Sequence, residues 1–168
     1  MANQLPGDST ASRAGVRNRL IFRLFQVCNT LQRQSAKQIG VTTVEWAVLG
    51  ALSRPQACDG MSVNALADFL IVSRQNLDGV LRRLEREARV TRSADAVDRR
   101  TRQVKMTPCG RILWLDLQPK IQEFYRQSLV NFRFDEQISL VHYLNKLQHD
   151  MDNLSLMPRC GPAGHSLN

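Results

Sequence analysis

The sequence predicts a mainly α-helical fold that carries one short β-hairpin. Most of the 168-residue chain has apolar residues at the three- and four-residue spacing of amphipathic helices. One pair of short β-prone stretches interrupts this pattern and flanks a charged turn. With 43% hydrophobic residues the chain can bury one core, so we expect a single domain over residues 13–155. Residues 1–12 and 156–168 are expected to be a disordered and a flexible tail.

Long amphipathic helices are predicted near both ends of this domain. Residues 13–37 have an apolar stripe at helical spacing, made of Ile21, Leu24, Phe25, Cys28 and Leu31. A helix is expected from Pro108 to about Arg133, kinked at Pro119, and another over 135–154. The last helix has a seam at spacings of 4, 3, 4 and 3, made of Leu140, Leu144, Leu147, Met151 and Leu154. Because such a seam packs best on a partner helix, we expect it to be buried against another helix.

Between these helices the chain predicts shorter elements. Gly40 ends the first helix, and Thr42 or Thr43 can cap the next, whose apolar stripe is Val44, Ala47, Val48 and Ala51. The stretch "SRPQACDG" over 53–60 predicts a loop, because it contains proline, an Asp-Gly pair and small residues.

Two short helices separated by a tight turn follow this loop. Ser62 is a plausible N-cap for a helix over 63–70, and Ser73 for a second helix. The core positions of the second helix are Leu77, Val80, Leu81 and Leu84. This arrangement predicts a helix-turn-helix.

The β-prone stretches "ARVTRS" and "TRQVKM" flank the charged stretch "ADAVDRR" at 94–100. They predict a two-stranded hairpin with an extended loop, which is a wing. Thr107 and Pro108 then supply an N-cap and a first-turn proline for the helix that follows. Residues 54–111 are therefore predicted to be a winged helix-turn-helix.

Charge and motifs narrow the class of function. The net charge is +8, and the stretch 54–111 alone holds 12 Lys and Arg against 7 Asp and Glu, so we expect an anionic partner. The chain has no apolar run near the roughly 20 residues of a membrane helix and no signal segment, so a cytoplasmic protein without a membrane partner is predicted. Its four cysteines form no CxxC pair, and no phosphate loop or nucleophile elbow occurs. Neither an enzyme, a cofactor nor a metal is predicted.

The second short helix has a face suited to reading DNA. A rotation of about 100° per residue places Gln75, Gly79, Arg82 and Arg86 opposite its apolar stripe. At its start the stretch "SRQN" consists of Ser73, Arg74, Gln75 and Asn76. Amide side chains can bridge two atoms of an adenine edge, and arginine can reach guanine or phosphate. A solvated polar face is the alternative interpretation.

These motifs together resemble the MarR family of bacterial winged-helix transcription regulators, over about residues 20–150. The similar stretches are "GVTTVEWAVLGAL", "LADFLIVSRQNLDGVLRRLER" and, above all, the wing pattern "VTRSADAVDRRTRQVKMTPCGR". Met106 and Ala88 depart from it, standing where the family usually has leucine and glycine. If residue 88 is left-handed, alanine adds about 1 kcal/mol of strain there.

The resemblance implies an obligate homodimer in which residues 13–37 and 112–155 are the dimerisation helices. It places two reading heads in successive major grooves and two wings in minor grooves. It implies that Asp98 and Arg100 brace the wing internally, while Arg99 enters a narrow A·T-rich minor groove. The predicted function is a ligand-responsive repressor of a double-stranded, pseudo-palindromic DNA operator. A nonspecific architectural DNA binder and a module for an acidic protein are the alternatives.

The resemblance also implies release of DNA by a small aromatic acid, which would suit the control of aromatic-compound catabolism. The candidate ligand-binding residues are Arg17, Arg19, Arg23 and Trp46, because an arginine fork holds both oxygens of a carboxylate. An acyl-CoA thioester is the alternative effector. Cysteine oxidation is a second alternative, with Cys109 as the redox candidate because a helix N-terminus favours thiolate.

Overall fold

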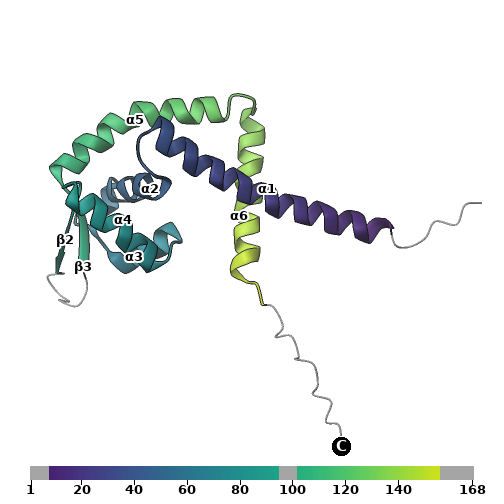
Figure 1. Cartoon of the computed structure of the whole chain (residues 1–168), viewed down its shortest axis with the longest axis horizontal. Helices are drawn as coiled ribbons and strands as arrows, with labels where there is room; N and C mark the ends of the chain where they lie inside the picture. The colour runs from purple at the N-terminus through teal and green to yellow at the C-terminus, as the bar shows by residue number, and fades with distance from the viewer. Residues whose placement is uncertain (1–7, 95–101, 156–168) are drawn as a thin grey trace, which may run out of the picture. The chain divides into compact units, whose positions relative to one another are not determined.

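The computed structural model describes residues 8–94 and 102–155 (Figure 1). Its helices are α1 (Asp8–Gln38), α2 (Thr43–Leu52), α3 (Val63–Leu70), α4 (Arg74–Arg86), α5 (Pro108–Ser128) and α6 (Phe134–Asp152), with one 3-10 turn, η1 (Pro55–Ala57). Its strands are β1 (Met61–Ser62), β2 (Val90–Ala94) and β3 (Arg102–Met106). The chain divides into two compact units, one ending at Tyr125 and the other beginning at Arg126. The predicted fold class, mainly helical with a small β-wing, is confirmed.

Side-chain caps position the helix-turn-helix as predicted. The hydroxyl of Ser62 accepts a hydrogen bond from the backbone amide of Ala65, and the hydroxyl of Ser73 accepts one from that of Asn76 at 3.2 Å. Each bond satisfies an amide that the first turn of a helix leaves without a backbone partner. The sequence therefore fixes where α3 and α4 begin, and so which residues lie in the first turn of α4.

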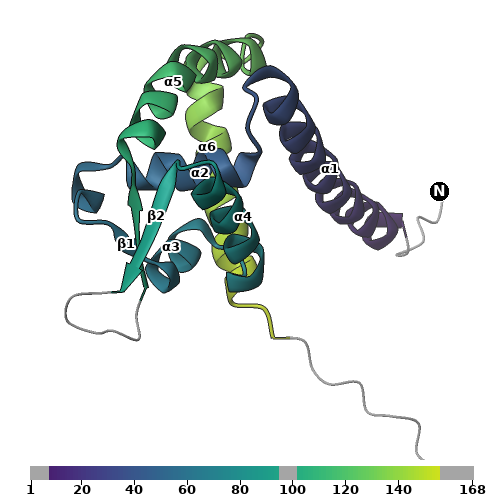
Figure 2. The same cartoon turned by 60° about the vertical axis from the view of Figure 1, so that its left-hand side comes forward.

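The wing strands β2 and β3 pair in the predicted antiparallel sense (Figure 2). In this pairing Val90 lies opposite Met106. The prediction of a two-stranded hairpin was incomplete, because the two-residue strand β1 pairs with the other edge of β3. A strand this short has too few residues to show alternation, and its pairing depends on the distant β3. The loop 95–101, which contains the predicted brace and tip residues, lies outside the described residues.

Several boundaries differ from the prediction. The helix α1 begins at Asp8 rather than at residue 13, because no proline or glycine interrupts the sequence between them. The helix α5 ends at Ser128 rather than near Arg133, and α6 starts at Phe134. There the carboxylate of Glu136 accepts a hydrogen bond from the backbone amide of Arg133 at 2.8 Å, which fixes the start of α6.

One apolar core lies beneath the helix-turn-helix and involves α2, α3, α4, β3 and α5. The predicted α4 positions Leu77, Leu81 and Leu84 are fully buried, and Val80 is half-buried. They pack with a cluster that includes Leu49 of α2, Leu66 of α3, Val104 of β3, and Leu117 and Ile121 of α5. This packing holds α4 with its polar residues directed outward.

The long helices α1 and α6 each keep an apolar face exposed. On α1 the exposed residues are Val16, Leu20, Ile21, Phe22, Phe25, Val27 and Leu31. On α6 they are Phe134, Ile138, Leu140, Val141, Tyr143, Leu144 and Met151. Over the described ranges, no helix combines the length and apolar character that would let it cross a membrane. Apolar faces of this extent on a folded chain usually mark an interaction surface.

The end of α4 has the strained backbone that the sequence suggested. Ala88 has a φ of 54°, in the left-handed region. The amide of Arg89 donates to the carbonyl of Leu84 at 2.8 Å, and that of Ala88 to the carbonyl of Glu85 at 2.9 Å. These two bonds form a Schellman motif, which usually has glycine at the left-handed position.

We expect Ala88→Gly to raise the free energy of unfolding by roughly 0.5–1 kcal/mol. Relief of about 1–2 kcal/mol of left-handed strain is partly offset by the greater freedom of glycine in the unfolded chain. Chemical denaturation at a fixed protein concentration measures the change. Ala65→Gly, in the right-handed helix α3, is the control and should lower the free energy of unfolding. An equal loss for both variants would contradict the strain at Ala88.

Candidate nucleic-acid interface

The first turn of α4 presents a row of exposed polar side chains. Arg74, Gln75 and Asn76 are all exposed, as predicted. Ser73 is exposed too, but its hydroxyl is engaged as the N-cap. A helix N-terminus carries partial positive charge, so this turn favours contact with an anion such as a phosphate.

Further along α4 the predicted face continues with Gly79, Arg82 and Arg86, which are exposed. A Cβ atom built on Gly79 would meet nothing within 4 Å, so a neighbouring surface can approach the helix closely here. Arg82 forms an ion pair with Asp78 at 2.6 Å, so its charge is partly compensated. The structure thus brings the six predicted α4 residues to the exposed side of one helix.

A partly buried arginine that the sequence reasoning missed joins this helix to the wing. The side chain of Arg92, on β2, is only 13% exposed. Its Nη1 donates to Asp78 Oδ1 at 2.7 Å, and its Nε and Nη2 donate to Glu85 Oε2 at 2.9 and 2.7 Å. Hydrogen bonds between charged partners are stronger than neutral ones, and the planar fork fixes the geometry. We name these three residues the Arg92 clamp.

The clamp favours the charged form of each of its three residues. The Arg92 hydrogen bond lowers the pKa of the Asp78 carboxyl, against the opposing effect of desolvation, and Arg82 contributes further. The same guanidinium lowers the pKa of Glu85. The hydrogen bond with Glu85 in turn raises the pKa of Arg92, ahead of that with Asp78. Both carboxylates on α4 are therefore held ionised and compensated.

A second ion pair fixes α4 to α2. Glu45 is 3% exposed, and its Oε1 lies 3.1 Å from Nε of Arg83. Its Oε2 accepts hydrogen bonds from the amide and hydroxyl of Thr42, while the Thr42 hydroxyl accepts from the Glu45 amide. This capping box, Thr42 to Glu45, has a sequence signature that could have identified it.

The base of the wing is joined to α5 by a predicted cap. The hydroxyl of Thr107 accepts from the amide of Gly110 at 3.0 Å and donates to the carbonyl of Ala88 at 2.6 Å. A side chain at Gly110 would clash with the carbonyl oxygen of Arg89, so only glycine fits this contact. The ends of α4, β3 and α5 thus meet at one joint.

The predicted effector residues are not in contact with one another in a single chain. Arg17, Arg19 and Arg23 are exposed on α1. Trp46 packs instead on α5, with ring-centroid distances of 6.3 Å to Phe124 and 5.6 Å to Tyr125. Burial raises the pKa of Tyr125. Trp46, which was predicted to contact the effector, is therefore part of an aromatic cluster with Phe124 and Tyr125.

The redox candidate occupies the expected place in α5. Cys109 is exposed in the first turn of this helix, and its Sγ lies 3.9 Å from Nη1 of Arg89. Among the described residues, no group of three or more potential metal ligands occurs.

Comparison with known proteins identifies the class to which this fold and interface belong. The MarR family profile matches residues 39–101. The transcriptional activatory protein BadR of Rhodopseudomonas palustris is 46% identical over 141 residues, which cover 82% of this chain and 81% of that protein. The homoprotocatechuate degradative operon repressor of Escherichia coli is 28% identical, covering 68% of this chain and 75% of the repressor.

One solved structure that is similar to this chain contains operator DNA. A cysteine-to-serine mutant of Escherichia coli MarR, complexed with operator DNA, superposes with a TM-score of 0.66 and 25% identity. The match covers 77% of this chain and 91% of that one. The protein is thus a DNA-binding transcriptional regulator with a winged helix-turn-helix, and not an enzyme. The chain belongs to the MarR family.

The lowered pKa values of the Arg92 clamp predict how stability depends on pH. Carboxyls with a lowered folded-state pKa add stability above their unfolded pKa, near 4, and lose it as the pH falls through the folded value. Replacing Arg92 by methionine should therefore destabilise the fold most near pH 7, and the difference from wild type should shrink below about pH 4. Urea denaturation of wild type and variant at several pH values measures the destabilisation near pH 7 and its decrease at low pH.

Arg82→Met is the matched control for this experiment. Arg82 also pairs with Asp78, but its side chain is 75% exposed against 13% for Arg92, so its loss should cost much less. Equal and pH-independent losses for the two variants would contradict the clamp.

Proposed function

We propose that the protein is a ligand-responsive regulator of genes for aromatic-compound catabolism. It acts as a cytoplasmic homodimer on a pseudo-palindromic operator and responds to a small aromatic acid. The observation that carries the proposal is the exposed first turn of α4, which the Arg92 clamp and the Glu45–Arg83 pair hold rigidly against the rest of the winged helix. A rigid scaffold allows a few side chains to read DNA in a fixed register.

The proposed DNA contacts divide into two kinds. Gln75 and Asn76 read base edges in the major groove, where amide side chains pair with adenine. Ser73, Arg74, Arg82 and Arg86 bind the backbone, with Arg74 also able to reach guanine. In the wing, Arg99 enters the minor groove, braced by Asp98 and Arg100.

Dimerisation is supported by the exposed apolar faces of α1 and α6. Each helix exposes seven or more large apolar side chains in the single chain, and leaving them in water is costly. A two-fold dimer buries the same faces on both copies and presents two reading heads. Sedimentation equilibrium should report twice the chain mass of 19.1 kDa, and a species of that single mass would contradict the dimer.

The effector class is supported by the E. coli relative, whose name refers to homoprotocatechuate, a phenolic acid. Arg17, Arg19 and Arg23 are available on α1 to pair with a carboxylate, and the Trp46 cluster can supply an apolar wall. In a dimer the arginines of one copy can meet the aromatic cluster of the other, which a single chain does not bring together.

Gel-shift titration tests the DNA contacts. We expect the wild type to prefer DNA upstream of its own gene over random duplex by a factor of about 10³ or more. Gln75→Ala and Asn76→Ala should reduce this preference, whereas Arg99→Ala should weaken binding through the wing. Loss of affinity by the same factor on both DNAs for all three variants would contradict the division. A wild type without any preference would favour an architectural DNA binder.

A reporter gene fused to the target promoter tests whether the protein represses or activates transcription. Repression, predicted from the sequence, requires expression to rise when the gene is deleted and when benzoate is added. Activation is a second candidate, favoured by the 46% identical relative that is an activatory protein. It requires expression to fall on deletion and to rise with benzoate only when the protein is present. A reporter unchanged by both deletion and benzoate would contradict the proposed function.

A further inference from the structure

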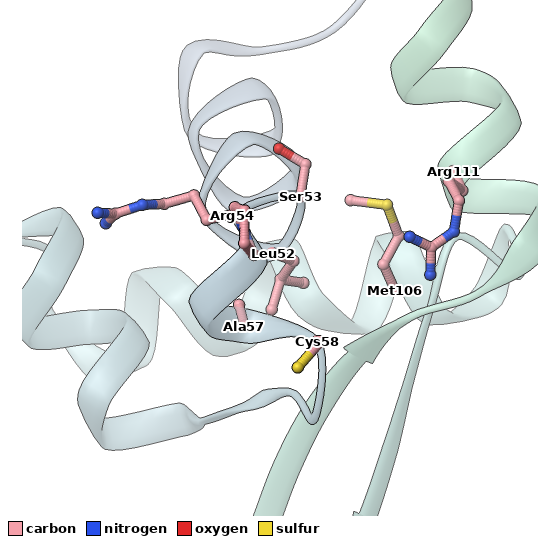
Figure 3. Close-up of a pocket in the computed structure, with 8 residues that line it drawn as sticks. Leu52, Ser53, Arg54, Ala57, Cys58, Met106 and Arg111 are labelled. Carbon is pink, nitrogen blue, oxygen red and sulfur yellow. The ribbon is translucent and has the colours of Figure 1, made fainter.

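A small cavity lies at the base of the wing, away from the Trp46 cluster. Its volume is about 130 Å³. It is lined by Leu52, Ser53, Arg54, Pro55, Ala57, Cys58, Met106 and Arg111, from the end of α2, η1, the end of β3 and the first turn of α5 (Figure 3). This pocket is open to solvent, and its volume is close to the roughly 150 Å³ of an enclosed cavity that holds one benzene ring, so it has room for a single aromatic ring.

The lining is mixed, with more polar than apolar surface, and it includes one available cation. Leu52, Pro55, Ala57 and Met106 supply the apolar surface. The lining includes two arginines and no acidic residue. Arg54 is engaged elsewhere, because its guanidinium lies 4.8 Å from the centroid of the Phe69 ring and points away from the cavity (Figure 3).

Arg111 is the cation directed toward the cavity. Figure 3 shows its side chain reaching from α5 toward Met106. Among the described residues no carboxylate lies within ion-pair distance of Arg111, unlike Arg82, Arg83 and Arg92. A planar guanidinium beside a ring-sized space that Leu52, Ala57 and Met106 also line suits a carboxylate attached to an aromatic ring.

We propose that this cavity binds a single-ring aromatic carboxylate, with Arg111 holding the carboxylate and Leu52, Ala57 and Met106 contacting the ring. The inference rests on the proposed function for the class of ligand but assigns it a site distinct from α1 and Trp46. Met106 ends β3, the strand that returns from the wing and pairs with β2. An occupied cavity is therefore in direct contact with the strand pair that carries the wing.

Cys58 provides a reporter at the site itself. Its thiol is exposed and lines the cavity, so N-ethylmaleimide can alkylate it in the free protein. Cys109 is exposed as well, but it lies two residues from Arg111 on α5 and so about 200° around the helix. Mass spectrometry of peptides containing each cysteine measures both alkylation rates in one sample.

We expect saturating benzoate to slow alkylation of Cys58 about five-fold or more while leaving Cys109 unchanged, since a bound ligand protects in proportion to its occupancy. Benzamide, which has the ring without the charge, should protect much less. Arg111→Met should abolish protection by benzoate. Lys120→Met, which removes another exposed cation from α5, should retain it.

Two outcomes would overturn the inference. If benzoate changes operator binding but does not protect Cys58, the effector binds elsewhere and the proposed function stands without this site. If benzoate protects Cys58 equally in Arg111→Met and wild type, the carboxylate is not held by Arg111. Protection with no effect on operator binding or on the reporter would support the site and contradict the proposed aromatic response.

Discussion

The contact between Arg92 and the two carboxylates of α4 is the interaction on which the reading head depends. A recognition helix must present cations to DNA, yet α4 carries Asp78 and Glu85, which would repel phosphate if they were free. Arg92, on the strand β2, binds both carboxylates, and its own side chain is only 13% exposed. One side chain thus compensates both carboxylates and ties α4 to the strand β2, so that the helix and the wing strands keep a fixed spacing.

The same logic recurs at the other boundaries of α4. Glu45 is buried, and burying its charge without partners would be costly. Its carboxylate, however, accepts a hydrogen bond from Thr42 and forms an ion pair with Arg83. Breaking either contact would leave an under-compensated charge in the interior. At the far end of α4, the Thr107 hydroxyl and the close approach of Gly110 connect the wing strands to α5. The polar contacts between α4 and other elements therefore lie at its joints with them, while the buried residues of α4, Leu77, Leu81 and Leu84, are all apolar.

Local features were predictable from the sequence, and tertiary ones were not. Ser62, Ser73 and Thr107 cap their helices within three residues, and the Leu77–Leu84 stripe depends only on helical spacing. Arg92, by contrast, is 7 and 14 residues from its partners, and no local periodicity relates them. The strand β1 was missed because the strand with which it pairs, β3, lies some forty residues away. The capping box at Glu45 was within reach of sequence analysis and was overlooked.

The open space beside Gly79 has a consequence for how such regulators can diversify. A side chain at position 79 would meet open space, and Gly79 takes no part in the leucine core of α4 or in the Arg92 clamp. A new side chain there would alter the exposed surface of α4, the surface proposed to contact DNA, while the buried leucines and Arg92 stay in place. Under the proposed function, operator preference and protein stability are therefore separable at this position. A duplicated gene could acquire a new target at residue 79 without first having to repair its fold.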